Sequence, residues 1–103
     1  MGRVTTKKVI SELKRMKKKL KIGSIFLFGS RARGEELLTS DVDVIVVSKK
    51  FEGIPFRKRP DTFLDYWTLP VDLEVLCYSP DELKRKRKEI GLVQEAMKQG
   101  VAV

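Results

Sequence analysis

Two aspartates stand two residues apart at the start of an apolar run. Asp41 and Asp43 open the segment 41–47, whose other residues are all valine or isoleucine. If this segment is a strand, side chains two apart project from the same face, so the two carboxylates lie together. Carboxylates held that close raise each other's pKa unless a cation neutralises them. Since oxygen ligands favour Mg²⁺ or Mn²⁺, the spacing predicts a divalent metal site. An ordinary polar strand entry is the alternative.

A third carboxylate is available from another apolar segment. Asp72 lies near the start of segment 71–78, and Glu74 follows two residues later on the same expected face. If this strand neighbours 41–47, three carboxylates can bridge two metals ~3.5–4 Å apart, as in phosphoryl displacement. A solvent-facing strand position is the alternative for Asp72 and Glu74.

A candidate phosphate-binding turn precedes the aspartates. Gly29 and Ser30 directly follow the apolar run 24–28, and Arg31 and Arg33 add positive charge. Glycine at a strand exit allows the backbone to approach a ligand closely, and the free N–H groups that begin a helical turn favour phosphate. An ordinary tight turn is the alternative for Gly29 and Ser30 alone.

Composition excludes several other chemistries. The 103 residues contain no histidine, which excludes Ser-His-Asp and Cys-His nucleophile pairs and the usual zinc sites. The lone Cys77 allows no internal disulfide, and no leader-like segment opens the chain, so we expect a cytoplasmic protein. No apolar run approaches the ~20 residues of a membrane span.

The net charge of +8 has two readings. It would suit nucleic acid or an acidic protein as a partner. However, 35% of the residues are charged, there is no asparagine, and only Gln94 and Gln99 are glutamine. This composition is typical of thermophile proteins, so the charge alone is weak evidence for a polyanionic partner.

Hydrophobic periodicity predicts one α/β domain over residues 1–103. We expect a helix over 7–21, capped by Thr6 and stopped by Gly23, and a final helix that begins with the capping box Ser79–Glu82 and breaks near Gly91. The remaining expected segments are strands 24–28, 41–47 and 71–78, a helical turn and loop over 31–40, a basic loop over 48–60 and a short helix through 63–67.

The run GSRARGEELLTSDVDVIVV resembles the signature of the DNA polymerase β-type nucleotidyltransferase superfamily, in particular its minimal nucleotidyltransferases. The segments VDLEVLCYSPDEL and EAMKQGVAV also resemble the C-terminal half of these small domains, so the resemblance covers nearly the whole chain. It implies a polymerase β-like fold, with a small mixed sheet flanked by helices.

The resemblance also implies roles for residues. Gly29 and Ser30 match the pair that holds the nucleoside triphosphate, and Arg31 and Arg33 match basic positions of the motif. Asp41 and Asp43 match the paired metal ligands. Asp72 matches the third carboxylate, which serves the metal on the acceptor side and helps to deprotonate the incoming hydroxyl. Glu74 is the substitute if the strand register differs by two.

The implied activity is transfer of a nucleoside monophosphate, with AMP from ATP favoured, to an acceptor hydroxyl with Mg²⁺ or Mn²⁺ as cofactor. Minimal relatives commonly occur beside a helical HEPN-type partner, and some are antitoxins that transfer AMP to a tyrosine of that partner. We therefore expect a protein acceptor and a homo- or hetero-oligomer, with RNA as the less favoured partner. Two alternatives stay open: a transferase acting on a small hydroxylated molecule, and a non-catalytic module that neutralises a partner by contact.

Overall fold

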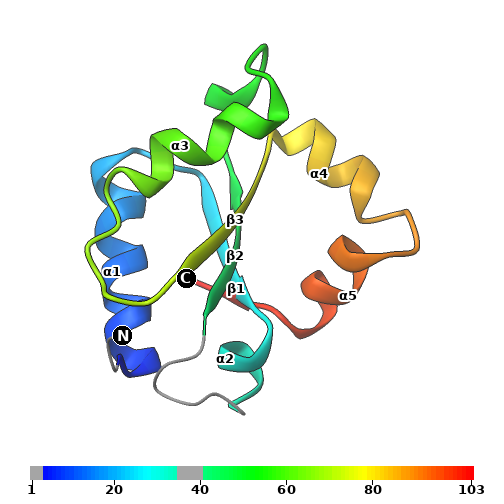
Figure 1. The fold of residues 1–103 in the computed structure, drawn as a ribbon. Coiled ribbons are helices and arrows are strands. Elements are labelled where there is room, and N and C mark those ends of the chain that lie inside the picture. Colours follow the sequence, from blue (N-terminus) through cyan, green and yellow to red (C-terminus); the bar gives the residue numbers. More distant parts are fainter. Residues whose placement is uncertain (1–3, 35–40) are drawn as a thin grey trace.

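The protein is built around a mixed four-stranded sheet with helices on both faces (Figure 1). A computed structural model describes residues 4–34 and 41–103. The strands are β1 (Ser24–Phe28), β2 (Val42–Val47), β3 (Leu73–Tyr78) and β4 (Val101–Ala102), in the order β3-β2-β1-β4. The helices are α1 (Thr6–Lys19), α2 (Ser30–Arg33), α3 (Arg59–Leu64), α4 (Pro80–Lys86) and α5 (Leu92–Gln99), with 3-10 turns η1 (Lys49–Phe51) and η2 (Phe56–Lys58). The expected α/β class is confirmed.

Strand pairing makes the sheet mixed. β1 runs antiparallel to both β2 and β4, whereas β2 and β3 are parallel. Parallel neighbours need a long crossover, because the chain must return to the same end of the sheet. Here that crossover is the segment 48–72, which contains η1, η2 and α3.

One face of the sheet is closed by α1 and α3. Alternation along β2 directs Val42, Val44 and Val46 to this face, where they are fully buried. The apolar stripe of α1, including Leu13 and Met16, packs against them in the larger core cluster. This face holds most of the buried apolar side chains and therefore most of the hydrophobic stabilisation.

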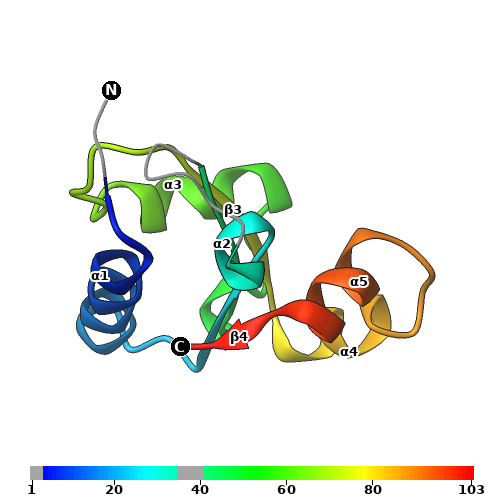
Figure 2. The ribbon, with the colours of Figure 1, turned by 90° about the horizontal axis from the view of Figure 1, so that it is seen from below.

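The other face is covered by α4 and α5, and only in part. Ile45 and Val47 project to this face and pack with Leu83 of α4 and Val93 of α5 in a smaller cluster. Asp43 shares their side of β2, because it precedes Ile45 by two residues. In Figure 2, α4 and α5 lie on the side of the sheet opposite α1.

The ends of α1 differ from the prediction. Thr5, not Thr6, caps the helix by accepting a bond from the Lys8 amide. The helix ends before Gly23, with Lys21 in the left-handed conformation at φ 53°. The Ile22 amide donates to the Lys17 carbonyl, which completes a Schellman-type end. Burial of Ile22, which is only 8% exposed, requires the chain to turn here.

The segment expected as a loop over 48–60 is more regular than predicted. It contains η1 and η2, and α3 begins at Arg59 rather than near Phe63. Arg59 is buried because its guanidinium bonds to the Glu82 carboxylate at 2.6 Å and to the Cys77 carbonyl at 3.2 Å. These partners lie on β3 and α4, so no local sequence pattern shows them.

The end of the chain supplies a strand that we did not predict. Val101 and Ala102 form β4 and pair with Leu27 and Phe26 of β1. Gly100 allows the chain to pass closely from α5 to β1, since a Cβ there would lie 2.7 Å from the Ala96 carbonyl oxygen and 3.2 Å from the Leu27 carbonyl oxygen. The capping box Ser79–Glu82 and the break near Gly91 are confirmed. Within the described residues, no helix is both long and apolar enough to span a membrane.

Candidate active site

The strand register brings the predicted carboxylates to one end of the sheet. Asp43 of β2 lies directly opposite Glu74 of β3. The Val42 amide donates to the Asp72 carbonyl at 2.8 Å, just before the paired residues begin. Asp41 and Asp72 are exposed and each immediately precedes its strand. Of the two candidates for the third carboxylate, the structure therefore places Glu74, the substitute, beside Asp43.

Asp43 and Glu74 repel each other as anions. Burial, a side-chain hydrogen bond with Glu74, and the negative charges of Glu74 and Asp41 together raise the pKa of Asp43 to about 6. Such a shift means that a proton, or another positive charge, is favoured between the two carboxyl groups. A shared proton or a bound cation would relieve this repulsion.

Gly29 makes room for the Asp43 carboxylate. Its neighbour Phe28 pairs with Asp43 across β1 and β2. Gly29 itself has a φ of 76°, which strongly favours glycine. A Cβ built on Gly29 would lie 2.5 Å from Asp43 Oδ2, closer than any side chain can approach. The glycine predicted at the strand exit is thus needed for the carboxylate as well as for the turn.

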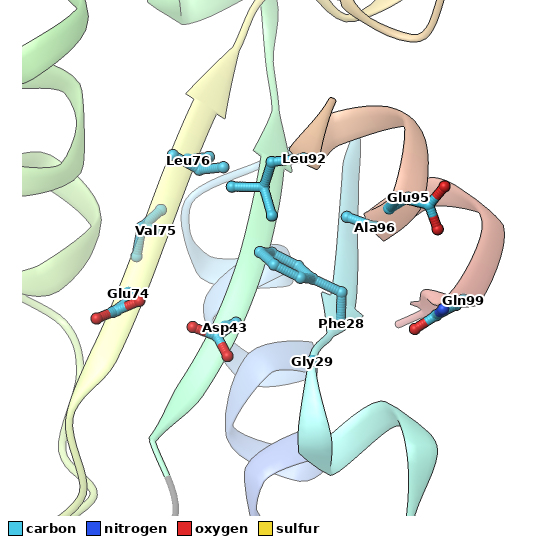
Figure 3. Close-up of a pocket in the computed structure, with 10 residues that line it drawn as sticks. All are labelled: Phe28, Gly29, Asp43, Glu74, Val75, Leu76, Leu92, Glu95, Ala96 and Gln99. Carbon is cyan, nitrogen blue, oxygen red and sulfur yellow. The ribbon is translucent and has the colours of Figure 1, made fainter. Parts of the chain in front are cut away.

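A pocket of about 390 Å³ opens beside these carboxylates (Figure 3). The sheet contributes Asp43, Glu74 and Phe28 to its wall, and α5 contributes Leu92 and Gln99. The full described lining is Phe28, Gly29, Asp43, Glu74, Val75, Leu76, Leu92, Glu95, Ala96 and Gln99. Three of these ten residues are acidic and none is basic, so an anionic ligand would need cations to enter.

The contribution of α5 was missed by the sequence analysis. The helix has an amphipathic pattern, which predicts an apolar face against the sheet but does not show where that face ends. Val93 and Ala96 are buried on the sheet, while Leu92 and Gln99 reach the pocket. Only the packing of α5 on the sheet shows that it forms a wall of the site.

The side chain of Arg31 points toward Val4 and Thr6 rather than toward the pocket. It is 3% exposed, and its Nη1 donates to the Val4 carbonyl at 2.6 Å and to Thr6 Oγ1 at 3.4 Å. Both partners belong to the start of α1, on the closed face of the sheet. Arg31 therefore ties α2 to α1. The side chains of Ser30 and Arg33, and residues 35–40 of the expected loop, lie outside the described part of the chain.

The carboxylates fit a hard divalent cation by their chemistry. Within residues 4–34 and 41–103, no group of three or more His, Cys, Asp or Glu side chains is already arranged around a metal position. Mg²⁺, however, keeps several waters and is commonly held by one or two carboxylates together with substrate phosphates. Asp43 and Glu74 supply such an all-oxygen pair, with Asp41 close enough to affect the pKa of Asp43.

The fold agrees with the comparisons to known proteins. Residues 7–102 match the family model described as a nucleotidyltransferase domain. The chain belongs to this nucleotidyltransferase family, and it is a transferase enzyme. The resemblance noted from the motif is thereby confirmed.

Two relatives are informative. A protein of Methanocaldococcus jannaschii named "putative protein adenylyltransferase" is 44% identical over 78 residues, which cover 71% of this chain and 80% of that protein. A crystal structure described as a "putative nucleotidyltransferase" from Sulfolobus solfataricus matches with a TM-score of 0.63. It is 23% identical and covers 95% of this chain and 78% of that one, so it supports the fold alone.

Proposed function

We propose that this enzyme transfers AMP from ATP to a hydroxyl group of another protein. The observation that carries the proposal is the pairing of Asp43 with Glu74 beside Gly29 in an acidic pocket. The relative from Methanocaldococcus jannaschii, whose name specifies protein adenylylation, supports the choice of nucleotide and acceptor class.

Divalent metal is part of the proposal. Bringing a triphosphate to a pocket with three acidic and no basic described side chains costs electrostatic free energy unless cations intervene. Asp43, Glu74 and Asp41 would hold Mg²⁺, with Mn²⁺ as the substitute. When bound, the metal supplies a positive charge that neutralises the phosphate oxygens and polarises the α-phosphorus.

The reaction is an in-line displacement at the α-phosphorus. The acceptor oxygen forms a bond to this phosphorus while the bond to the oxygen bridging the α- and β-phosphates breaks, and pyrophosphate leaves with the electron pair. The proton of the hydroxyl passes to a carboxylate of the site and then to solvent. We assign this step to Glu74, and its position opposite Asp43 in the strand register supports the assignment.

The other predicted residues receive supporting roles. The Gly29–Ser30 turn holds the triphosphate next to Asp43, and Arg33 adds positive charge there. Arg31 positions this turn by its bonds to Val4 and Thr6. Asp72, which matches the third carboxylate of the motif, lies two residues before Glu74 on the same face of the strand. It assists the incoming hydroxyl.

We propose a tyrosine of a helical HEPN-type protein as the acceptor, with this enzyme as the antitoxin of the pair. The two proteins would form a hetero-oligomer in the cytoplasm. This acceptor rests on the motif resemblance and on the named activity of the relative, and a transfer assay decides it.

The test incubates the enzyme with ATP labelled on the α-phosphate, Mg²⁺ and HEPN-type partners. Label is expected on the partner with the wild type, and loss of that label is expected with EDTA, Asp43→Asn or Glu74→Gln. The matched Asp72→Asn variant separates the two candidates for the third carboxylate, because it is expected to retain more transfer than Glu74→Gln. Equal labelling by the wild type and Asp43→Asn would overturn the metal assignment. Neutralisation of the partner without labelling would support the contact-only module.

A further inference from the structure

The turn between α4 and α5 exposes apolar side chains that the fold does not use. Ile90 is 95% exposed and Leu92 is 65% exposed, which makes them the most exposed large apolar residues in the described chain. Every residue from Lys84 to Leu92 is exposed. We call residues 84–92 the basic–apolar arm.

The C-terminal part of the arm, between α4 and α5, lies at the edge of the molecule. In Figures 1 and 2 the α4–α5 connection forms the outer edge, on the side opposite α1 and α3. Gly91 is extended, with φ 155° and ψ −163°, a combination that L side chains rarely adopt, and the chain bends over residues 89–91 between α4 and α5. This turn presents the side chain of Ile90 to solvent. Burial of such a side chain on a partner is favourable, whereas its exposure brings the fold nothing.

The arm is also strongly basic. It contains Lys84, Arg85, Lys86, Arg87 and Lys88, followed by Glu89. Lys86 pairs with Glu89 at 3.3 Å, an exposed ion pair within the arm itself. The positive charges that precede Ile90 in the arm would attract acidic groups and steer their approach.

The arm is continuous with the active site. Leu92 ends the arm and also lines the catalytic pocket, where Figure 3 shows its side chain over β2, near Phe28. A chain docked on the arm would therefore lie next to a residue that lines the pocket. This continuity is the second observation, besides charge, that indicates a role for the arm.

We infer that the basic–apolar arm docks an acidic polypeptide that carries an exposed apolar side chain, and that this polypeptide is the acceptor protein. The second part rests on the proposed function. Protein interfaces combine apolar anchors with a charged rim, which is the pattern of Ile90 and Leu92 among lysines and arginines. Single-stranded nucleic acid is usually held by aromatic side chains on which bases stack, and the arm has none.

The test measures binding apart from catalysis. The probe is a fluorescein-labelled synthetic peptide in which glutamates and leucines alternate around one tyrosine, and anisotropy reports its dissociation constant. Ile90→Ser, and the double variant Lys84→Glu with Lys88→Glu, are each expected to weaken binding about tenfold or more. A peptide with serine in place of leucine should also bind more weakly, as should the acidic peptide at high salt.

Matched controls come from other surfaces of the chain. Leu64→Ser changes another exposed apolar side chain, and Lys14→Glu with Lys18→Glu reverses two exposed charges at the same spacing on α1. Both controls are expected to stay within about twofold of the wild type, the scatter of ordinary surface changes. Asp43→Asn should bind normally too, so docking survives even if AMP transfer is never observed.

Three outcomes would overturn the inference. The peptide could fail to bind the wild type, or the control variants could weaken binding as much as the arm variants. A parallel experiment uses labelled single-stranded RNA in place of the peptide. If the RNA binds the wild type but not Ile90→Ser or the lysine variant, and the peptide does not bind, the arm is a nucleic-acid surface instead.

Discussion

Two acidic residues with little exposure, Glu12 and Asp43, lie on opposite faces of the same sheet. The pKa of Glu12 is lowered, whereas the pKa of Asp43 is raised. On the closed face, hydrogen bonds from Arg15 and from Thr68 hold the pKa of Glu12 near 2, despite its burial. On the open face, burial and the Glu74 carboxyl group raise the pKa of Asp43 to about 6.

The difference lies in the partners of each carboxylate. Glu12 finds positive charge and donors within the fold, and its 8% exposed side chain stabilises the packing of α1 on the segment around Thr68. Asp43 faces other acidic side chains, and their repulsion lowers the stability of the fold. A bound cation would relieve this repulsion. A buried carboxylate with its charge satisfied is structural, and one with its charge unsatisfied is a candidate for function.

Removal of the Asp43 charge should have the largest effect. Asp43→Asn is expected to lower AMP transfer about 10³-fold, because it removes a carboxylate that would hold the cation needed to neutralise the reacting phosphate. The same variant should raise the free energy of unfolding at pH 7 by about 1–2 kcal/mol, since the repulsion with Glu74 disappears. Labelled-ATP transfer and urea denaturation measure the two effects. A variant that is both less active and less stable would contradict the comparison.

Displacement of Asp43 without a change in its charge should have the next largest effect. Gly29→Ala places a methyl group 2.5 Å from Asp43 Oδ2, and a misplaced reacting group of this kind can cost about 100-fold in rate. Gly34→Ala is the matched control, because Gly34 has a similar φ of 73° and, among the described residues, no atom within 4 Å of an added Cβ. Only backbone strain is expected there. Equal loss of transfer in both variants would assign the effect to strain rather than to the contact.

Glu12→Gln should affect stability and not catalysis. The loss of charge-assisted bonds to Arg15 and Thr68 is expected to lower the free energy of unfolding by about 2 kcal/mol. Thermal or urea unfolding measures this change, and the rate of AMP transfer well below the melting temperature should match the wild type. A loss of transfer comparable to that of Asp43→Asn would remove the distinction between the two faces.

The smallest effect is a non-monotonic dependence of stability on pH in metal-free buffer. As the pH falls from 7 to 5, Asp43 takes up a proton in the folded state before it would in the unfolded chain, so stability should rise by about 1 kcal/mol. Glu12 and Glu82 have folded-state pKa values of about 2, so the stability that they contribute is full above pH 4.5 and is lost as the pH falls toward 2. Urea unfolding across this range should show the rise absent in Asp43→Asn and the later fall reduced in Glu12→Gln.

Local patterns predicted most of the fold. The capping box at Ser79 and the apolar runs of β1, β2 and β3 depend on neighbouring residues, and the structure has them close to the expected bounds. β4 was missed because two residues carry no periodicity, and their strand exists only through pairing with β1. Likewise, the early start of α3 depends on the bonds of Arg59 to distant partners.

The site divides in the same way. The motif identifies Asp41, Asp43 and Gly29 as a group, because its spacing is local. Whether Asp72 or Glu74 faces Asp43 depends on the register of β2 against β3, which the sequence leaves open by two residues. The inward direction of Arg31 depends on Val4 and Thr6, whose position beside α2 is a result of tertiary packing.

The parallel crossover 48–72 has a consequence for how this chain can change. None of the described residues that line the pocket beside Asp43 belongs to it, since Gly29 and residues of β1, β2, β3 and α5 supply that lining. Gly53 lies in an exposed turn of the crossover, and no atom in the described part of the chain comes within 4 Å of an added Cβ. Insertions there would lengthen the enzyme while its chemistry stays intact, so this small fold has a region in which new domains or reporter tags can be accommodated.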